Sequence, residues 1–287
     1  MTYKLSRRIF MLEMLMAVAA CTTESTRLNQ QLELVIGIIS YGQEKQTVER
    51  LSGFRKYLSE QLRMIVQIEP AFNERIAIER MKRHSWSLVF ATPGLAAIAI
   101  YNYQYSTIFP LQLSTNSRSI IIVRQDSTLK KLSDLQGKTI ALGQQGSATG
   151  YYIPLYNLYG LTLASILFAA TPKVSLEWVS SGKVDAAAIS LEEFNFYKSK
   201  IDSSQFSIIF EDSHPIPEGS VLISPKIERK RYDVIRNRMK NAPLSLIQEA
   251  KYIPSASPPD YQYMIGVVKR VASIAENLNS KPVRLVN

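Results

Sequence analysis

The feature that most constrains the fold is a regular alternation of short apolar runs with amphipathic segments along the chain. Residues 32–40 form an apolar run rich in β-branched side chains, and residues 46–62 then place apolar side chains three and four positions apart. The first pattern is typical of a buried strand and the second of a helix. Repeated strand–helix pairs of this kind predict βαβ units on largely parallel sheets.

The alternation occurs in two successive series, which predicts an α/β body with two lobes. The first series has predicted strands at residues 32–40, 64–69, 87–91 and 108–113. The second has strands at 119–124, 138–143, 185–190 and 207–210, and 221–224 then leads into a helical last third. Helices are predicted at 46–62, 73–82, 93–101, 129–132, 172–181, 229–239, 244–250 and 261–278, with one more that opens at Ser147 and runs to Tyr159.

Residues 1–21 have the layout of an export signal. A basic stretch at residues 4–8 precedes an apolar run at residues 9–20 that ends in small side chains. This run is too short to span a bilayer, and no later stretch reaches 18 consecutive apolar residues. The protein is therefore expected to act outside the cytoplasm, in the periplasm or an equivalent extracytoplasmic space.

Two details predict a lipid anchor. Residues 6–11 resemble the twin-arginine export signature, and residues 18–21, Val-Ala-Ala-Cys, resemble a lipobox. In this interpretation Cys21 is acylated and becomes the first mature residue, held to a bacterial membrane by its lipid. As the only cysteine, it leaves no internal disulfide. The polar residues 22–31 then form a flexible tether. The alternative is an amphipathic N-terminal helix with an incidental cysteine, which Glu13 inside the apolar run favours.

Composition and charge limit the class of partner. The chain is 46% hydrophobic and 20% charged, as expected for a soluble globular body rather than a disordered or membrane-embedded one. Its net charge is +10, of which the leader carries +2, so +8 remains on the rest. Such an excess permits an anionic partner. Nucleic acid is not expected, because the chain has an export signal and no nucleic-acid motif, and the basic residues at 228–238 are interpreted as a solvated helix face.

The segment most suggestive of chemistry is residues 138–154, where a predicted strand runs into a glycine-containing turn and then a helix. Free backbone N–H groups and the helix dipole favour an anion at such a helix start. Ser147 and Thr149 add hydroxyl donors, and Gly150 lets a ligand approach the backbone. The alternative is that a serine or threonine here is a helix N-cap with no ligand. The spacing does not match a nucleotide P-loop.

Three segments, in order along the chain, resemble a known family. They are residues 134–143 (Asp-Leu-Gln-Gly-Lys-Thr-Ile-Ala-Leu-Gly), 146–154 (Gly-Ser-Ala-Thr-Gly-Tyr-Tyr-Ile-Pro) and 181–189 (Ser-Gly-Lys-Val-Asp-Ala-Ala-Ala-Ile). Together they resemble the second lobe of the phosphate/phosphite/phosphonate-binding proteins of ABC transporters, in the type 2 periplasmic-binding superfamily. The resemblance implies two lobes with a hinge and a central ligand cleft. Residues 32–118 and 215–287 would form lobe 1, and residues 119–214 lobe 2, with crossings near Arg118 and His214.

The resemblance also implies a binding site without catalytic residues or cofactors. A small oxyanion would be gripped by the hydroxyls and amides of the turn and by residues of the first lobe, and an ABC permease would receive it. The implied ligand-binding residues are Tyr41, Thr92, Ser147, Ala148, Thr149, Gly150 and Ser190. Ala148 departs from the family pattern because the turn there usually carries a hydroxyl. Phosphonate-binding members also use acidic residues of the second lobe, for which Glu192 and Glu193 are less certainly placed candidates.

Two other functions remain open from the sequence. A monomeric transport-binding protein is the leading interpretation, and a sensory module that signals to a membrane partner could share its fold. An enzyme on the same scaffold would need a nucleophile and a base in reach, and no nucleophile elbow or His-Glu-x-x-His motif occurs. The two histidines, His84 and His214, lack metal-ligand spacing, so no metal site is expected.

Overall fold

The computed structural model describes residues 33–112, 118–198, 205–214 and 216–286. The predicted export signal, the predicted anchor Cys21 and the predicted tether at 22–31 lie outside these residues. From Leu34 onward the chain forms one compact unit. Within the part that the structure describes, every helix is too short or too polar to cross a membrane.

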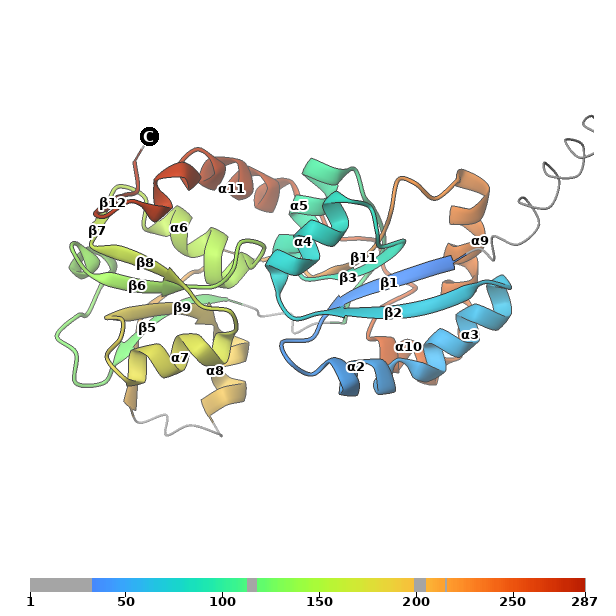
Figure 1. The fold of residues 1–287 in the computed structure, drawn as a ribbon, viewed down its shortest axis with the longest axis horizontal. Coiled ribbons are helices and arrows are strands. Elements are labelled where there is room, and N and C mark those ends of the chain that lie inside the picture. The colour runs from blue at the N-terminus through green and yellow to red at the C-terminus, as the bar shows by residue number, and fades with distance from the viewer. Residues whose placement is uncertain (1–32, 113–117, 199–204, 215, 287) are drawn as a thin grey trace, which may run out of the picture. The chain divides into compact units, whose positions relative to one another are not determined.

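The first lobe is built on a five-stranded sheet of order β2-β1-β3-β11-β4 (Figure 1). Its strands are β1 Glu33–Ile39, β2 Ile65–Ala71, β3 Leu88–Ala91, β4 Ser106–Pro110 and β11 Ser220–Ile223. Its helices are α2 Glu44–Arg50, α3 Ser52–Leu62, α4 Glu74–Lys82, α5 Pro93–Tyr103, α9 Arg229–Lys240 and α10 Leu244–Ala250. Alternate residues of β3 enter different cores: Leu88 and Phe90 pack with α3 and α9, and Val89 and Ala91 with α4 and α5. Helices therefore cover both faces of the sheet.

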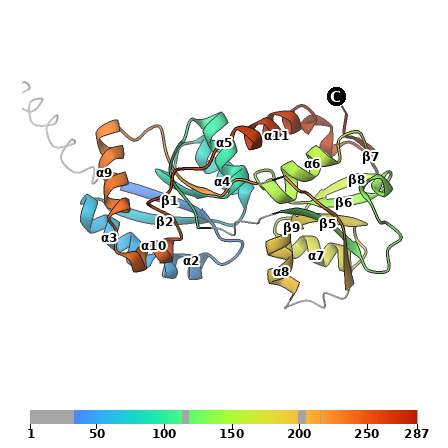
Figure 2. The same cartoon turned by 180° about the vertical axis from the view of Figure 1, so that it is seen from behind.

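The second lobe is built on a five-stranded sheet of order β10-β5-β9-β6-β8 (Figure 2). Its strands are β5 Ser119–Arg124, β6 Thr139–Leu142, β8 Ser165–Phe168, β9 Ala186–Ser190 and β10 Phe206–Glu211. Helical segments are η1 Leu132–Leu135, the π-helical turn η2 Ala148–Tyr152, α6 Ile153–Asn157, α7 Pro172–Ser180 and α8 Leu191–Lys198. Ile120 and Ile122 pack against α7 and α8, while Ile121 and Val123 face the core shared with α6.

Both sheets are mixed rather than largely parallel. β1 and β3 are parallel, as the βαβ pattern predicts, but β11 is antiparallel to both β3 and β4. In the second sheet β6 is parallel to β8 and β9, and β5 is antiparallel to β9 and β10. The antiparallel strands β5 and β11 are the ones that enter a sheet directly after the chain has crossed from the other lobe. A crossover helix sets parallel pairing, and no such helix precedes these two strands.

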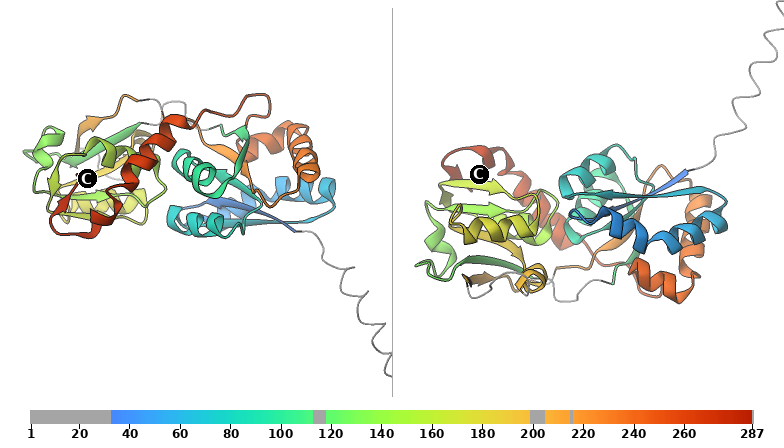
Figure 3. Two further views of the ribbon diagram at one scale, coloured as in Figure 1. Left: turned by 90° about the horizontal axis from the view of Figure 1, so that it is seen from above. Right: turned by 60° about the horizontal axis from the view of Figure 1, so that its bottom comes forward.

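The predicted lobe boundaries assign all of residues 215–287 to the first lobe, but the structure places part of this segment against the second lobe. β11, α9 and α10 do belong to the first lobe. α11 Gln262–Ala272 instead packs against both α5 and α6 (Figure 3). β12 Val283–Arg284, after the 3-10 turn η4 Ala275–Asn279, then pairs antiparallel with β7 Thr162–Leu163 of the second lobe. The apolar face of α11, with Met264, Val267, Val268 and Val271 buried, explains this course, because it covers the joint between the lobes.

One apolar core runs through that joint. It contains residues of the first lobe from α4 and α5, residues of the second lobe from β5, β6 and α6, and the buried face of α11. α5 lies at its centre, and its side chains from Leu95 to Ala99 are all buried. A helix that is apolar all round is expected where it is covered on every side. The two lobes are thus packed together along the edge of the candidate site.

Candidate ligand-binding site

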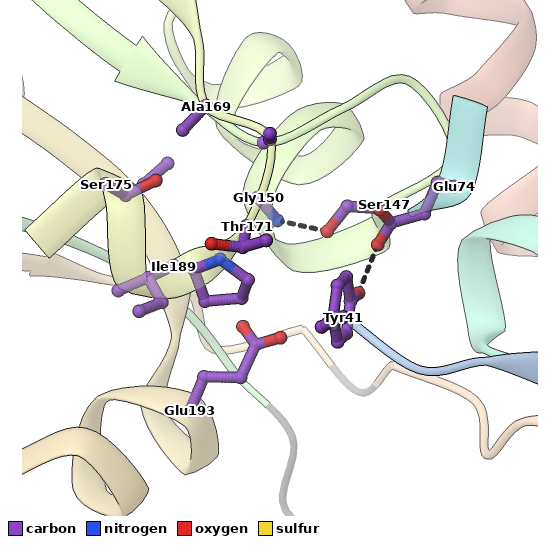
Figure 4. A pocket seen from close by; sticks show the side chains of 13 residues that line it. Tyr41, Glu74, Ser147, Gly150, Ala169, Thr171, Ser175, Ile189 and Glu193 are labelled. Carbon is purple, nitrogen blue, oxygen red and sulfur yellow. Dashed lines mark hydrogen bonds between the residues drawn. The ribbon is translucent and has the colours of Figure 1, made fainter. Parts of the chain in front are cut away.

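A small cavity lies where the two lobes meet (Figure 4). The first lobe contributes the loop after β1 and the first turn of α4. The second lobe contributes the ends of β6, β8 and β9 with the segments that follow them. The lining residues are Tyr41, Glu74, Gly143, Ser147, Gly150, Ala169, Ala170, Thr171, Pro172, Ser175, Ala188, Ile189 and Glu193.

The turn after β6 presents Ser147 to this cavity. The backbone N–H of Gly143 donates to the carbonyl of Gly150 (2.8 Å), which closes the turn. The Ser147 Oγ accepts a hydrogen bond from the N–H of Gly150 (2.9 Å), so Ser147 is the N-cap of η2, which continues directly into α6. Capping uses a lone pair of the hydroxyl oxygen and leaves its O–H free to donate. The cap interpretation and the ligand interpretation are therefore compatible in one side chain.

A second helix start faces the same space. Thr171 is the N-cap of α7, its Oγ1 accepting from the N–H of Val174 (3.4 Å), and Pro172 and Ser175 of the first turn line the cavity. The N-termini of α7 and of η2–α6 thus converge on one point. Each carries partial positive charge, so the second lobe favours an anion there.

The first lobe contributes a tyrosine bonded to a carboxylate. Tyr41 follows β1, and its hydroxyl donates to Oε1 of Glu74. Glu74 opens α4, whose N-cap Asn73 accepts from the N–H of Ile76 (3.2 Å). Burial raises the pKa of Glu74 to about 7, and the hydrogen bond from Tyr41 only partly opposes this shift. Burial, reinforced by the charges of Glu74 and Glu193, raises the pKa of Tyr41 well above its usual value, so its hydroxyl keeps its proton.

A second carboxylate enters from the other lobe. Glu193 is in the first turn of α8, and its Oε2 accepts from the backbone N–H (3.1 Å) and the hydroxyl (2.8 Å) of Ser190. In return the N–H of Glu193 donates to Ser190 Oγ (3.0 Å), which completes a capping box. Burial raises the pKa of Glu193, although its bonds to Ser190 oppose the shift.

The backbones of the two lobes touch beside the cavity at Gly94 and Gly146. A Cβ atom on Gly94, in the first turn of α5, would lie 2.2 Å from the carbonyl oxygen of Gly146 and 2.6 Å from the nitrogen of Ala148. A Cβ atom on Gly146, whose φ is +117°, would lie 2.6 Å from Cβ of Glu74. Both positions therefore require glycine for this close approach.

The structure brings together three of the seven predicted ligand-binding residues, namely Tyr41, Ser147 and Gly150. Ala148 is next to Gly94 at the contact between the lobes. Thr149 is almost fully buried, and its carbonyl accepts from the hydroxyl of Ser119 (2.6 Å). Ser190 acts as the cap of α8 and holds Glu193 in place rather than lining the cavity itself.

Thr92 does not line the candidate site. It lines a neighbouring cavity of the first lobe, which shares Tyr41 with the candidate site and also contains Arg50 and Lys251. The Thr92 hydroxyl oxygen is buried, and none of the described residues gives it a hydrogen bond. Tyr41, with a backbone φ of 47°, thus lies between the two cavities.

The sequence interpretation did not include Glu74, Thr171 or Ser175 in the site. Each of them follows the C-terminal end of a strand: Glu74 follows β2, and the other two follow β8. Ligands of α/β proteins bind at this edge of a sheet, so the place of Glu74 after the predicted strand at 64–69 was an available signal. β8 was not predicted as a strand, so Thr171 and Ser175 had no such signal. Glu193 was named as a candidate, but its position could not be fixed without the capping box. Across the described ranges, acidic, histidine and cysteine side chains form no group of three that could hold a metal ion.

Comparisons with known proteins agree with this architecture. A family described as "ABC transporter, phosphonate, periplasmic substrate-binding protein" matches residues 36–255. No curated protein matches the sequence significantly. Among solved structures, the binding protein of a phosphonate ABC transporter from Pseudomonas aeruginosa is 16% identical, with 86% of this chain and 88% of that chain covered and a TM-score of 0.65.

Two further structures share the fold. PhnD1 from Prochlorococcus marinus, solved in complex with methylphosphonate, is 19% identical with a TM-score of 0.66, over 84% of this chain and 99% of that one. XAC2383 from Xanthomonas citri, solved with ATP, is 19% identical with a TM-score of 0.68, over 84% and 98%. These likenesses confirm the predicted two-lobe α/β binding-protein fold, and the family match covers most of the chain. The chain therefore belongs to the periplasmic substrate-binding proteins of phosphonate ABC transporters.

Proposed function

We propose that this protein holds a small oxyanion of the phosphonate class at the Ser147 turn and delivers it to the permease of an ABC importer. The observation that carries the proposal is the convergence of two helix N-termini, η2–α6 and α7, on a cavity closed from the other side by Tyr41 and Glu74. Family membership itself gives the protein a small ligand, a permease partner and a place outside the cytoplasm. The family consists of solute-binding proteins rather than enzymes.

The donors available to the oxyanion are the hydroxyls of Ser147, Thr171 and Ser175 and backbone N–H groups of the two helix starts. Hydrogen bonds to a charged group contribute about 1.5–3 kcal/mol each. Three or four of them are enough for micromolar binding after the cost of ordering the ligand and closing the lobes. A ligand that bonds both lobes favours the conformation in which they meet, because only that conformation makes all of the bonds.

We further propose that the protein is a monomer. We also propose that it is anchored through an acylated Cys21, as its lipobox-like sequence indicates. Labelled palmitate should then enter the wild-type protein and not a Cys21→Ser variant. Equal labelling of the two would contradict the anchor and leave the binding function untouched.

Replacing Ser147 tests the oxyanion site. The Ser147→Ala variant loses one hydroxyl donor and is expected to bind its oxyanion about tenfold more weakly, as measured by calorimetry against phosphonates, phosphite, phosphate and sulfate. Because alanine also removes the helix cap, it should lower the free energy of unfolding by about 1 kcal/mol. A Ser147→Asp variant keeps an N-cap acceptor but places a negative charge where the oxyanion would lie, so it should lose binding altogether.

The pair of variants separates capping from ligand binding. If Ser147 were only a cap, the aspartate variant would bind as the wild type does, and the proposed role would be wrong. Ser180→Ala is the matched control, since the Ser180 hydroxyl bonds to Gln205 (2.8 Å) at the far end of α7.

A further inference from the structure

The first lobe has a basic end, where strand β1 begins. Six exposed lysine and arginine side chains form this basic end: Arg63, Lys82, Arg83, Lys226, Arg229 and Lys230. Two carboxylates accompany them, since Glu228 precedes Arg229 and Glu33 precedes Leu34 in the sequence. The lobe therefore carries an excess of positive charge at an end that the oxyanion site does not use.

Backbone hydrogen bonds show that the segments of the basic end lie together. The N–H of Ser87 donates to the carbonyl of Val35 (2.8 Å), so the loop before β3 lies beside the start of β1. The N–H of Ser224 donates in turn to the carbonyl of Ser87 (2.9 Å), and Nζ of Lys226 donates to the carbonyl of Arg83 (3.2 Å). The α4–β3 and β11–α9 loops are thus in contact where the chain enters the lobe.

The ends of α3 and α9 complete the basic end, as Figure 1 shows. Arg63 is the C-cap of α3 and leads into β2, the neighbour of β1 in the sheet. The N–H of Ser40, just after β1, donates to the carbonyl of Ala71 at the end of β2 (2.9 Å), so the two strands also begin at the same end. Helix α9 begins there with Arg229 and Lys230, directly after the β11–α9 loop.

Most of this positive charge is not neutralised within the lobe. Among the described residues, Arg229 pairs with Asp233 (3.8 Å), and the other five basic side chains form no ion pair. Exposed ion pairs contribute little in water, so these side chains are available to a partner. Because they come from three separate segments, they form a broad array of charge, which fits a surface that carries many anionic groups.

The place where the chain enters the lobe indicates which surface this is. Cys21, the proposed site of acylation, is 13 residues before Leu34 in the sequence, and a chain of that length spans at most about 45 Å. A lipid on Cys21 would therefore hold the end where β1 begins close to the membrane. Anionic lipid headgroups attract lysine and arginine side chains that come within a Debye length, about 8 Å at physiological salt.

We propose that the basic end rests on the anionic lipid surface of the membrane. The inference goes beyond the oxyanion function, and it takes from the proposed anchor only the side from which the membrane is approached. A lipid chain and a basic patch together hold a protein at a membrane more firmly than either alone. Tyr41 and Glu74 of the candidate site follow the opposite ends of β1 and β2, so contact with lipid leaves the cavity uncovered.

Vesicle binding by the unacylated protein tests the basic end without the anchor. The body from Leu34 onward forms one compact unit, so the chain from residue 21 onward, with Cys21→Ser, is sufficient for the test. It should sediment with vesicles of mixed phosphatidylcholine and phosphatidylglycerol but not with vesicles of phosphatidylcholine alone. Added salt should release it, because salt screens exposed charges.

Two variants with the same change in net charge separate the basic end from charge in general. The test variant has four substitutions in the basic end: Lys82→Gln, Arg83→Gln, Lys226→Gln and Lys230→Gln. The control variant has four at exposed lysines of the second lobe: Lys130→Gln, Lys131→Gln, Lys173→Gln and Lys183→Gln. Each basic side chain near an anionic surface raises the affinity roughly fivefold, so the test variant should bind the anionic vesicles at least about 100-fold more weakly. The control variant should stay within about threefold of the starting protein.

Three results would overturn the proposal: equal binding to both kinds of vesicle, no binding of the starting protein to either, or an equal loss in both variants. The second is the result expected if the basic end meets an acidic protein surface instead. Calorimetry with oxyanions should give the same affinity in both variants, because all eight positions lie outside the cavity. Failure of the vesicle test therefore leaves the oxyanion site standing, and a protein that binds vesicles but no oxyanion contradicts only the proposed function.

Discussion

Replacing Gly94 by alanine is expected to weaken ligand binding roughly 100-fold while the protein stays folded. The new Cβ atom would lie 2.2 Å from the carbonyl oxygen of Gly146, and neither backbone can give way as a flexible side chain could. The lobes would have to separate at this point, and the ligand would lose contacts on one side. Two lost hydrogen bonds to a charged group, at about 1.5 kcal/mol each, correspond to this change in affinity.

The free energy of unfolding should also fall in the Gly94→Ala variant. Alanine is the better helix former in the first turn of α5, but the clash lies inside the apolar core that runs through the joint between the lobes. Calorimetry and thermal unfolding without ligand measure the two effects separately. Gly266→Ala in α11 is the matched control, because a Cβ atom there meets nothing within 4 Å. Wild-type affinity in the Gly94→Ala variant would show that binding does not need this contact.

The sequence predicts most of the regular elements of the fold, but it does not predict strand β8 or helix α8. The predicted strand at 119–124 has the same bounds as β5, and the predicted strand at 185–190 is β9 apart from its first residue. The two-residue strands β7 and β12 could not be predicted, because two residues show no period and their pairing joins segments about 120 positions apart. This unpredicted pairing carries the C-terminal segment to the second lobe.

Some helix boundaries could not be predicted either. One helix was expected over 46–62, but the backbone of Leu51, at φ −90° and ψ 6°, separates α2 from α3. A short helix was expected at 129–132, and the structure instead has the 3-10 turn η1 at Leu132–Leu135. Apolar spacing reports which face of a segment is buried, and it continues unchanged through a local break of this kind.

Only the part of the candidate site that lies in a local sequence motif could be predicted. The Ser147 turn has a recognisable order of strand, glycine and hydroxyl, so its helix start was expected. Glu74 belongs to an ordinary amphipathic helix in the sequence, and only the tertiary packing of α4 beside Gly146 places its carboxylate in the cavity.

Gly37 is the position where we expect substitution to cost the most stability. It is in β1, paired with Val89 of β3, and a Cβ atom there would lie 1.9 Å from Cδ2 of Trp86, whose ring is fully buried. A Gly37→Ala variant must therefore displace the ring or part the two strands. We expect the free energy of unfolding to fall by about 3 kcal/mol or more, which corresponds to a drop in Tm of roughly 10 °C.

A double-mutant cycle with Trp86→Leu tests the cause of this loss. If the clash with the indole is responsible, the two substitutions together should cost less than the sum of their separate effects, because leucine no longer occupies the space that the new Cβ atom needs. Additive effects would assign the loss to the backbone of β1 instead. The same variants can also be tested for ligand binding, because β1 ends two residues before Tyr41, which lines the candidate site. If the ring displaces β1, the Gly37→Ala variant should also lose ligand affinity, and Trp86→Leu should restore part of it.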